Sequence, residues 1–169
     1  MTPTVLELPR DTGWTPEVLA SLPADFKYEV REGNLVIMNA AMRFWHGQVQ
    51  ARLAHLLGPI AATEQGIVLG DDEIRVCDVA QFHQAPPGNK AFHNPSTVSL
   101  VVEIASPGSE REDRHVKPQL YAAAGIDEFW LVEETGAGQA LVHRHVLQGE
   151  IYESAGDPVL LDDMEAAEG

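Results

Sequence analysis

The chain has 169 residues, and its content of 44% hydrophobic and 22% charged residues is typical of a globular protein with room for a buried core. Asp and Glu outnumber Lys and Arg by 26 to 11, and the resulting net charge of −15 disfavours tight non-specific binding of duplex nucleic acid. No apolar run approaches the roughly 20 residues that cross a bilayer, and the single cysteine, Cys77, excludes an internal disulfide.

The first third of the chain predicts a helix, a hairpin and a second helix. These segments are 15–22, 26–38 and 43–57. Thr15-Pro16 supplies an N-cap and a first helical residue, Gly33-Asn34 is typical of a hairpin turn, and Gly58-Pro59 ends the second helix. The expected apolar face of the second helix consists of Phe44, Val49, Leu53, Leu56 and Leu57.

The rest of the chain alternates strands with loops and one more helix. Strands are expected over 66–69, 73–82, 98–105, 128–133, 140–146 and 150–153. The proline-rich segment 84–97 is interpreted as a loop. A helix is expected from about Pro118 to Ala124, with Lys117 at its N-terminal edge. This order predicts an α/β or α+β fold with a mixed central sheet flanked by helices.

No linker or internal repeat divides the chain, so we expect a single domain over 1–169. Its ends, 1–12 and 162–169, are expected to be mobile, the second because it is a short acidic run. The N-terminus lacks a basic segment followed by an apolar core, so no signal peptide is expected. Together with the lone cysteine, this favours the cytoplasm.

Two carboxylates interrupt strands that otherwise have buried character. Asp78 lies in the strand 73–82 and Glu103 in the strand 98–105, and Lys117 follows shortly after. A carboxylate in a buried strand is unfavourable unless a cation or hydrogen bonds compensate it. Mg²⁺ is often held by one or two carboxylates, and a nearby lysine can stabilise charge that develops on phosphorus. The pattern indicates metal-dependent phosphodiester chemistry.

Each of these residues also has a purely structural interpretation. Asp78 and Glu103 would then be a buried pair neutralised by Lys117 or Arg75, without turnover. Lys117 itself would be a surface lysine. Tyr121, four residues after Lys117, is expected in the core, and a position lining the site is the alternative. Asp113, four residues before Lys117, is expected to form a salt bridge with it. The histidines, including His46 and His55, lack the spacing of a closed zinc site and are expected to be solvated or hydrogen-bonded.

The segment 101–133 closely resembles the Uma-two family of restriction-endonuclease-like proteins, a branch of the PD-(D/E)XK nuclease superfamily. Further matches are the hairpin segment 28–36, the helix that opens at His46 and the strand segment 75–79. The resemblance covers roughly residues 15–155. It implies a restriction-endonuclease-like core.

The resemblance also implies roles for individual residues. Asp78 matches the first metal-binding acid and Glu103 the acid of the second motif, and the Ile104 carbonyl is a candidate third metal ligand. The lysine of the superfamily would fall at position 105, where this chain has alanine. The family pattern places a lysine on the following helix, which Lys117 matches. Glu29 matches an acid of the first hairpin and could complete the site, although a solvated hairpin acid is the alternative.

From these residues we expect an endonuclease that depends on Mg²⁺ or Mn²⁺ and hydrolyses nucleic-acid phosphodiester bonds, in DNA in preference to RNA. A homodimer is expected, because superfamily nucleases often need two sites for two strands, and no membrane partner is expected. The alternative is a catalytically degenerate relative that acts as a binding module, which the acidic charge favours. A metal-free structural protein is a third interpretation, but it does not explain why Asp78, Glu103 and Lys117 would lie together.

Overall fold

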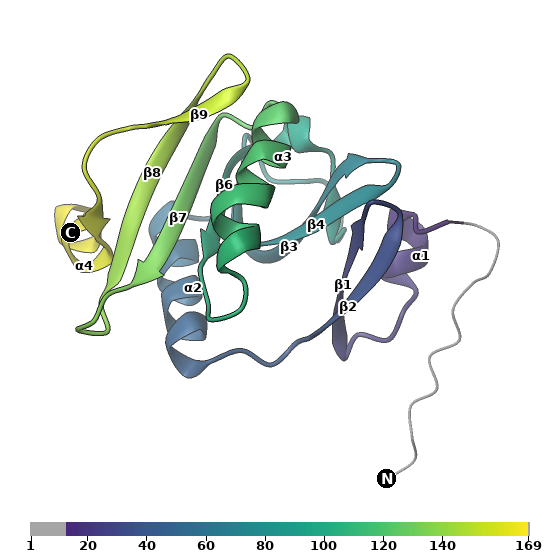
Figure 1. Ribbon diagram of the computed structural model, residues 1–169, viewed down its shortest axis with the longest axis horizontal. Helices are drawn as coiled ribbons and strands as arrows, with labels where there is room; N and C mark the ends of the chain where they lie inside the picture. The colour runs from purple at the N-terminus through teal and green to yellow at the C-terminus, as the bar shows by residue number, and fades with distance from the viewer. Residues whose placement is uncertain (1–12, 169) are drawn as a thin grey trace, which may run out of the picture.

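Ten strands form one mixed sheet in the computed structural model, which describes residues 13–168 (Figure 1). The strands are β1 Phe26–Arg31, β2 Asn34–Asn39, β3 Ala61–Gly70, β4 Glu73–Phe82, β5 Phe92–His93, β6 Val98–Ile104, β7 Glu128–Glu134, β8 Ala140–Gln148, β9 Ile151–Ser154 and β10 Val159–Leu160. The main path runs β10-β8-β7-β6-β4-β1-β2, and β3, β5 and β9 pair beside it. The parallel pairings are β6–β7 and β3–β5. The sheet is therefore mixed, as the sequence predicts.

Helices cover both faces of this sheet. They are α1 Pro16–Ala20, α2 Phe44–Leu57, α3 Lys117–Ala123 and α4 Leu161–Glu168. In Figure 1, α3 crosses in front of β6 while α2 lies behind the sheet. Across residues 13–168, none of these helices has the length and apolar character needed to cross a membrane.

Strand β6 runs through the middle of the sheet and contributes to two cores. Successive side chains of a strand point to opposite faces. Val102 and Ile104 accordingly pack in the core that includes Val49 and Leu53 of α2, whereas Val101 packs with Tyr121 of α3. The alternation places the Glu103 side chain on the α3 side, where it contacts Lys117 and Tyr121.

The predicted hairpin and second helix are confirmed, with local differences. The hairpin turn is centred on Glu32-Gly33, which have φ values of 50° and 78°. Two consecutive residues with positive φ are typical of the tight hairpin turn that matches the strand twist. In α2 the prediction for Phe44 was wrong, because its side chain is 81% exposed. The buried positions of that helix are His46, Val49, Gln50 and Leu53.

The third helix is preceded by a π-helical turn, Glu112–Val116, which the sequence does not predict. Pro118 has no N–H to give to a carbonyl one turn back, and its ring crowds that carbonyl. The wider turn accommodates this, since the Lys117 N–H donates to the carbonyl of Glu112, five residues back. Lys117 therefore lies inside a continuous helical segment and not at a free helix end.

The acidic C-terminal segment, for which we expected mobility from residue 162, forms helix α4 instead. Leu161 is fully buried against the α2 side of the sheet. Arg52 of α2 binds both Asp162, at 2.5 Å, and Glu165, at 2.6 Å. An apolar anchor and opposite charge explain why this segment docks. The other predicted mobile end, 1–12, and residue 169 lie outside the described residues.

Candidate active site

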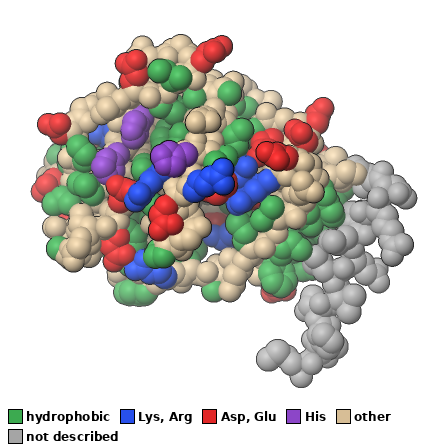
Figure 2. Space-filling model, in the orientation of Figure 1, with side chains coloured by type: hydrophobic (Ala, Val, Ile, Leu, Met, Phe, Trp, Pro, Cys, Tyr) green, Lys and Arg blue, Asp and Glu red, His purple; other side chains and the backbone are tan. Residues whose placement is uncertain are grey.

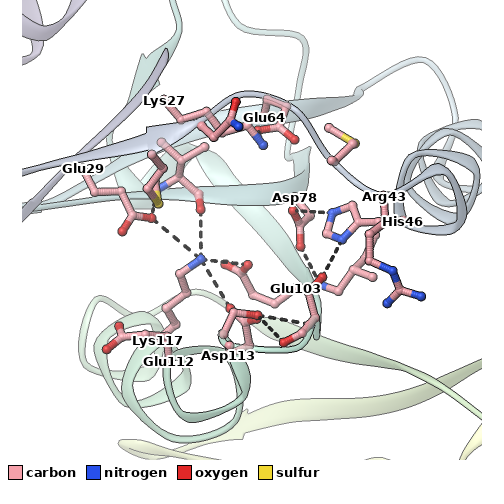
Figure 3. A pocket seen from close by; sticks show the side chains of 18 of the residues that line it. Lys27, Glu29, Arg43, His46, Glu64, Asp78, Glu103, Glu112, Asp113 and Lys117 are labelled. Atoms are coloured by element: carbon pink, nitrogen blue, oxygen red, sulfur yellow. Dashed lines mark hydrogen bonds and ion pairs between the residues drawn. The ribbon is translucent and has the colours of Figure 1, made fainter.

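A cavity of about 480 Å³ opens between the β1–β2 hairpin, the start of α2 and the segment that leads into α3 (Figure 3). All the residues that the sequence predicts for the site line it, namely Asp78, Glu103, Lys117, Glu29 and Ile104. Other ionisable side chains in its wall are Lys27, Arg31, Arg43, His46, Glu64, Glu112 and Asp113. The cavity therefore brings together groups that are distant in the sequence.

A buried ion pair between Glu103 and Lys117 forms the floor of the cavity. The Lys117 ammonium lies 2.9 Å from Glu103 Oε2 and also donates to the Val76 carbonyl at 3.0 Å. The Tyr121 hydroxyl donates to Glu103 Oε1 at 2.7 Å. Glu103 comes from the central strand, and the other two come from successive turns of α3. Their spacing of four residues places Lys117 and Tyr121 on one helical face.

Burial and neighbouring charges have opposite effects on the pKa of Glu103 and on that of Lys117. Burial raises the pKa of Glu103 well above its usual value, even though the Lys117 ammonium acts in the opposite direction. Burial alone would lower the pKa of Lys117, but the surrounding carboxylates of Glu103, Glu29 and Asp113 outweigh it and raise that pKa. Lys117 is therefore held as a cation, suited to electrostatic stabilisation and not to accepting a proton.

Asp78 is fixed at the edge of the cavity by contacts to both of its carboxylate oxygens. The Ile104 N–H donates to Oδ2 at 2.6 Å, and His46 Nε2 lies 3.0 Å from Oδ1. The Gln50 amide, one turn after His46 on α2, donates to the main-chain carbonyl of Asp78 at 2.9 Å. Because Ile104 follows Glu103 directly, the bond to Oδ2 brings the two predicted acids to the same end of the sheet.

Glu29 lies on the far side of Lys117 from Asp78 (Figure 3). Its Oε1 accepts the Val76 N–H at 3.0 Å and lies 3.8 Å from the Lys117 ammonium. Its Oε2 binds the Arg31 guanidinium at 2.7 Å and lies 3.5 Å from that of Arg75. Although burial opposes it, the nearby cations hold the pKa of Glu29 below its usual value. Its contacts are therefore those of a carboxylate that positions Lys117.

Asp113 completes the surroundings of the lysine. Its Oδ1 lies 3.6 Å from the Lys117 ammonium, which confirms the predicted salt bridge, and its Oδ2 accepts the Ser109 hydroxyl at 2.5 Å. Asp113 lies in the π-helical turn that precedes α3. Burial raises the pKa of Asp113. Three carboxylates therefore lie within 4 Å of one ammonium.

The cations on the rim of the cavity are paired with acids. Lys27 binds Glu64 at 2.6 Å and Arg43 binds Glu134 at 2.7 Å. Arg31 lies 3.8 Å from Glu112 in addition to its bond with Glu29. In the middle of the face shown in Figure 2, blue Lys and Arg side chains likewise lie next to red Asp and Glu side chains. The three cations of the rim are therefore each neutralised by a neighbouring acid.

Of the further residues that contact the predicted site, two were given structural roles by the sequence and two were missed. The expectation that His46 is solvated or hydrogen-bonded is confirmed, because both of its ring nitrogens have polar partners. Tyr121 is buried, as expected, and it also binds Glu103. Gln50 and Ser106 were not considered. The signal available for α2 was the stripe His46, Val49, Gln50, Leu53, in which two polar residues occupy buried positions at helical spacing.

The donor set of this cavity fits a hard divalent cation. Asp78 and Glu103 supply carboxylate oxygens, and each ionised carboxylate has about four lone-pair positions, so one hydrogen bond per oxygen leaves room for a cation. Mg²⁺ is commonly held by one or two carboxylates, with water and phosphate in the rest of its shell. Over residues 13–168, no group of three or more His, Cys, Asp or Glu side chains forms a ready-made metal site.

Comparisons with known proteins agree with this architecture. A family model named Uma2 and described as "Putative restriction endonuclease" matches residues 16–166. Among solved structures, the chain is similar to "a putative nuclease belonging to DUF820" from Anabaena variabilis. The TM-score is 0.58 and the sequence identity 16%, over 87% of this chain and 83% of that one, so this likeness shows the fold alone. No curated protein gives a significant match.

Proposed function

Since the chain belongs to the Uma2 family, as its motifs predict, we propose that it is an endonuclease that hydrolyses phosphodiester bonds with the help of Mg²⁺ or Mn²⁺. The observation that carries this proposal is the buried pair of Glu103 and Lys117 beside Asp78, in the wall of an open cavity. A buried pair far from any opening would suit a structural role, whereas this one faces space that a phosphate could enter.

In this proposal Asp78 and Glu103 hold the cation, with the Ile104 carbonyl as a further oxygen ligand. When bound, the cation supplies Lewis acidity toward the phosphate and toward water. The ammonium of Lys117 stabilises the negative charge that develops on the phosphoryl group in the transition state, or it orients the attacking water. Glu29 and Asp113 keep that ammonium charged and fix its position. Tyr121 orients the Glu103 carboxylate through its hydroxyl.

The substrate in this proposal is nucleic acid, and DNA in preference to RNA. With rim cations already paired to acids and a net charge of −15, binding through the phosphate backbone should be weak and sensitive to salt. The same observation favours the second candidate function, a binding module without turnover whose partner approaches the cavity. The two functions differ in whether bonds are broken, so a cleavage assay separates them.

The test is nicking of a supercoiled plasmid and cleavage of a single-stranded oligonucleotide with Mn²⁺. Glu103→Gln removes the negative charge of a proposed metal ligand and leaves the volume of the side chain almost unchanged. It should therefore abolish cleavage while the protein stays folded. Glu150→Gln, an exposed acid in the turn between β8 and β9, is the matched control and should cleave like the wild type. Equal trace activity in the wild type and Glu103→Gln would identify a contaminant and favour the binding module.

A further inference from the structure

His46 occupies an unusual position for a helical histidine, because it is buried and both of its ring nitrogens face polar partners at the cavity. Nε2 lies 3.0 Å from Asp78 Oδ1, and Nδ1 lies 3.0 Å from the Ser106 hydroxyl. Its side chain is 11% exposed and lines the same cavity as Glu103. The two hydrogen bonds fix the imidazole plane in one orientation.

The helix does not need this histidine to contact the strand. Gln50, one turn further along α2, already donates to the Asp78 main-chain carbonyl and also binds Glu64 at 2.5 Å. Val49 and Leu53 pack the same helix against the sheet. Because other residues already hold α2 against the sheet, the contact of His46 with the Asp78 carboxylate points to a role at that carboxylate.

The distance of 3.0 Å between His46 Nε2 and Asp78 Oδ1 also matches the distance between neighbouring ligand atoms around one cation. In an octahedral shell with metal–ligand bonds of about 2.1 Å, adjacent ligand atoms lie about 3.0 Å apart. A metal-binding histidine characteristically donates its other ring N–H to a nearby oxygen, which fixes its tautomer. Ser106 Oγ is placed to accept that proton from Nδ1.

We propose that His46 Nε2 and Asp78 Oδ1 are ligands of one divalent cation, with Ser106 as the residue that positions the imidazole. This inference rests on the proposed metal-dependent function and adds a nitrogen donor to its oxygen ligands. Imidazole binds first-row transition metals better than it binds Mg²⁺, which prefers oxygen. The site should therefore prefer Mn²⁺ to Mg²⁺.

The experiment combines isothermal titration with pulsed electron paramagnetic resonance of bound Mn²⁺, on the chain without a histidine tag. The wild type should show coupling between Mn²⁺ and a nitrogen nucleus. His46→Asn should lose that coupling and bind Mn²⁺ at least about 10-fold more weakly, with a smaller change for Mg²⁺. His55→Asn, on an exposed turn of the same helix, should behave like the wild type. Ser106→Ala should weaken Mn²⁺ binding without abolishing the coupling.

The wild-type spectrum and the Asp78→Ala variant together decide the matter even if His46→Asn fails to fold. Mn²⁺ binding that Asp78→Ala abolishes, but that shows no nitrogen coupling, would overturn the role of His46 and leave the proposed function intact. Mn²⁺ binding that is absent, or that Asp78→Ala does not change, would overturn both.

Discussion

At the scale of single residues, Lys117 has the most restrictive environment in the site. Three carboxylates surround its ammonium, and α3 and the π-helical turn before it fix the direction from which it approaches Glu103. Removing one member of a buried ion pair costs about 3–5 kcal/mol, because the remaining charge is left uncompensated. The charge of Lys117 therefore matters for stability as well as for the proposed chemistry.

We predict that Lys117→Met retains Mn²⁺ binding but loses turnover by at least about 100-fold, because the lysine acts on developing charge and not on the ion. Activity is to be normalised to the folded fraction measured by circular dichroism. Lys90→Met, at an exposed loop position, serves as the control for a lost lysine. Unchanged turnover in folded Lys117→Met would assign the residue a structural role.

The burial of Glu103 leads to a prediction of how the free energy of unfolding depends on pH. Its pKa is raised in the folded protein, and an unfolded glutamate titrates near 4.3. An acid whose pKa is raised on folding contributes stability below its unfolded pKa and loses that contribution as pH rises through the folded pKa. The free energy of unfolding of the wild type, minus that of Glu103→Gln, should therefore decrease as the pH rises above about 4. Urea denaturation at several pH values measures this difference, and an increase with pH would show that the attraction to Lys117 outweighs burial.

At the scale of secondary structure, α4 is the element whose docking was least expected. Leu161 contributes an apolar anchor in the core, whereas Arg52 contributes ion pairs at the surface. We predict that Leu161→Ala lowers the free energy of unfolding by about 2–5 kcal/mol. Arg52→Ala should lower it by less than about 1 kcal/mol, because exposed ion pairs are screened by water and salt. Chemical denaturation of both variants checks the ranking, and a larger effect of Arg52→Ala would contradict it.

The elements show what the sequence could predict and what it could not. Strand β6 and its embedded acid were predictable, because an apolar run with one carboxylate is a local pattern. The hydrogen bond from the Ile104 N–H to Asp78 was not, because it depends on how β4 and β6 end relative to each other. The buried polar positions of α2, His46 and Gln50, could be recognised in the sequence by their helical spacing. Their common partner in the sheet, Asp78, could not be predicted. The π-helical turn depends on packing around Pro118 and leaves no distinct sequence signal.

At the scale of the whole molecule, the mixed sheet and the family were predictable from the order of motifs, whereas the pairing of charges was not. Two of the rim cations bind acids that are distant in the sequence, Lys27 with Glu64 and Arg43 with Glu134. Sequence composition alone gives only the sum of charges. The fold brings cations to the cavity and neutralises most of them there.

We predict a homodimer, because an acidic monomer is poorly suited to hold both strands of a duplex. Multi-angle light scattering at high protein concentration should give a mass twice that of one chain. The measurement should be repeated at low and high salt, because two chains that each carry a net charge of −15 repel less when screened. A monomer under both conditions would contradict this prediction and limit the proposed activity to single strands or to nicking.

The single thiol provides a reporter for motion at the site. Cys77 is fully buried next to Asp78, its Sγ lies 3.3 Å from the Gln65 carbonyl, and burial raises its pKa well above the usual value. The thiolate is the species that attacks a thiol-labelling reagent, so labelling of this buried thiol at neutral pH requires a transient opening of β4. The native chain should therefore react far more slowly than its unfolded form. If a cation holds Asp78 to its neighbours, Mn²⁺ should slow labelling further in the wild type but not in Asp78→Ala. The opening of this strand can thus be timed without an engineered probe.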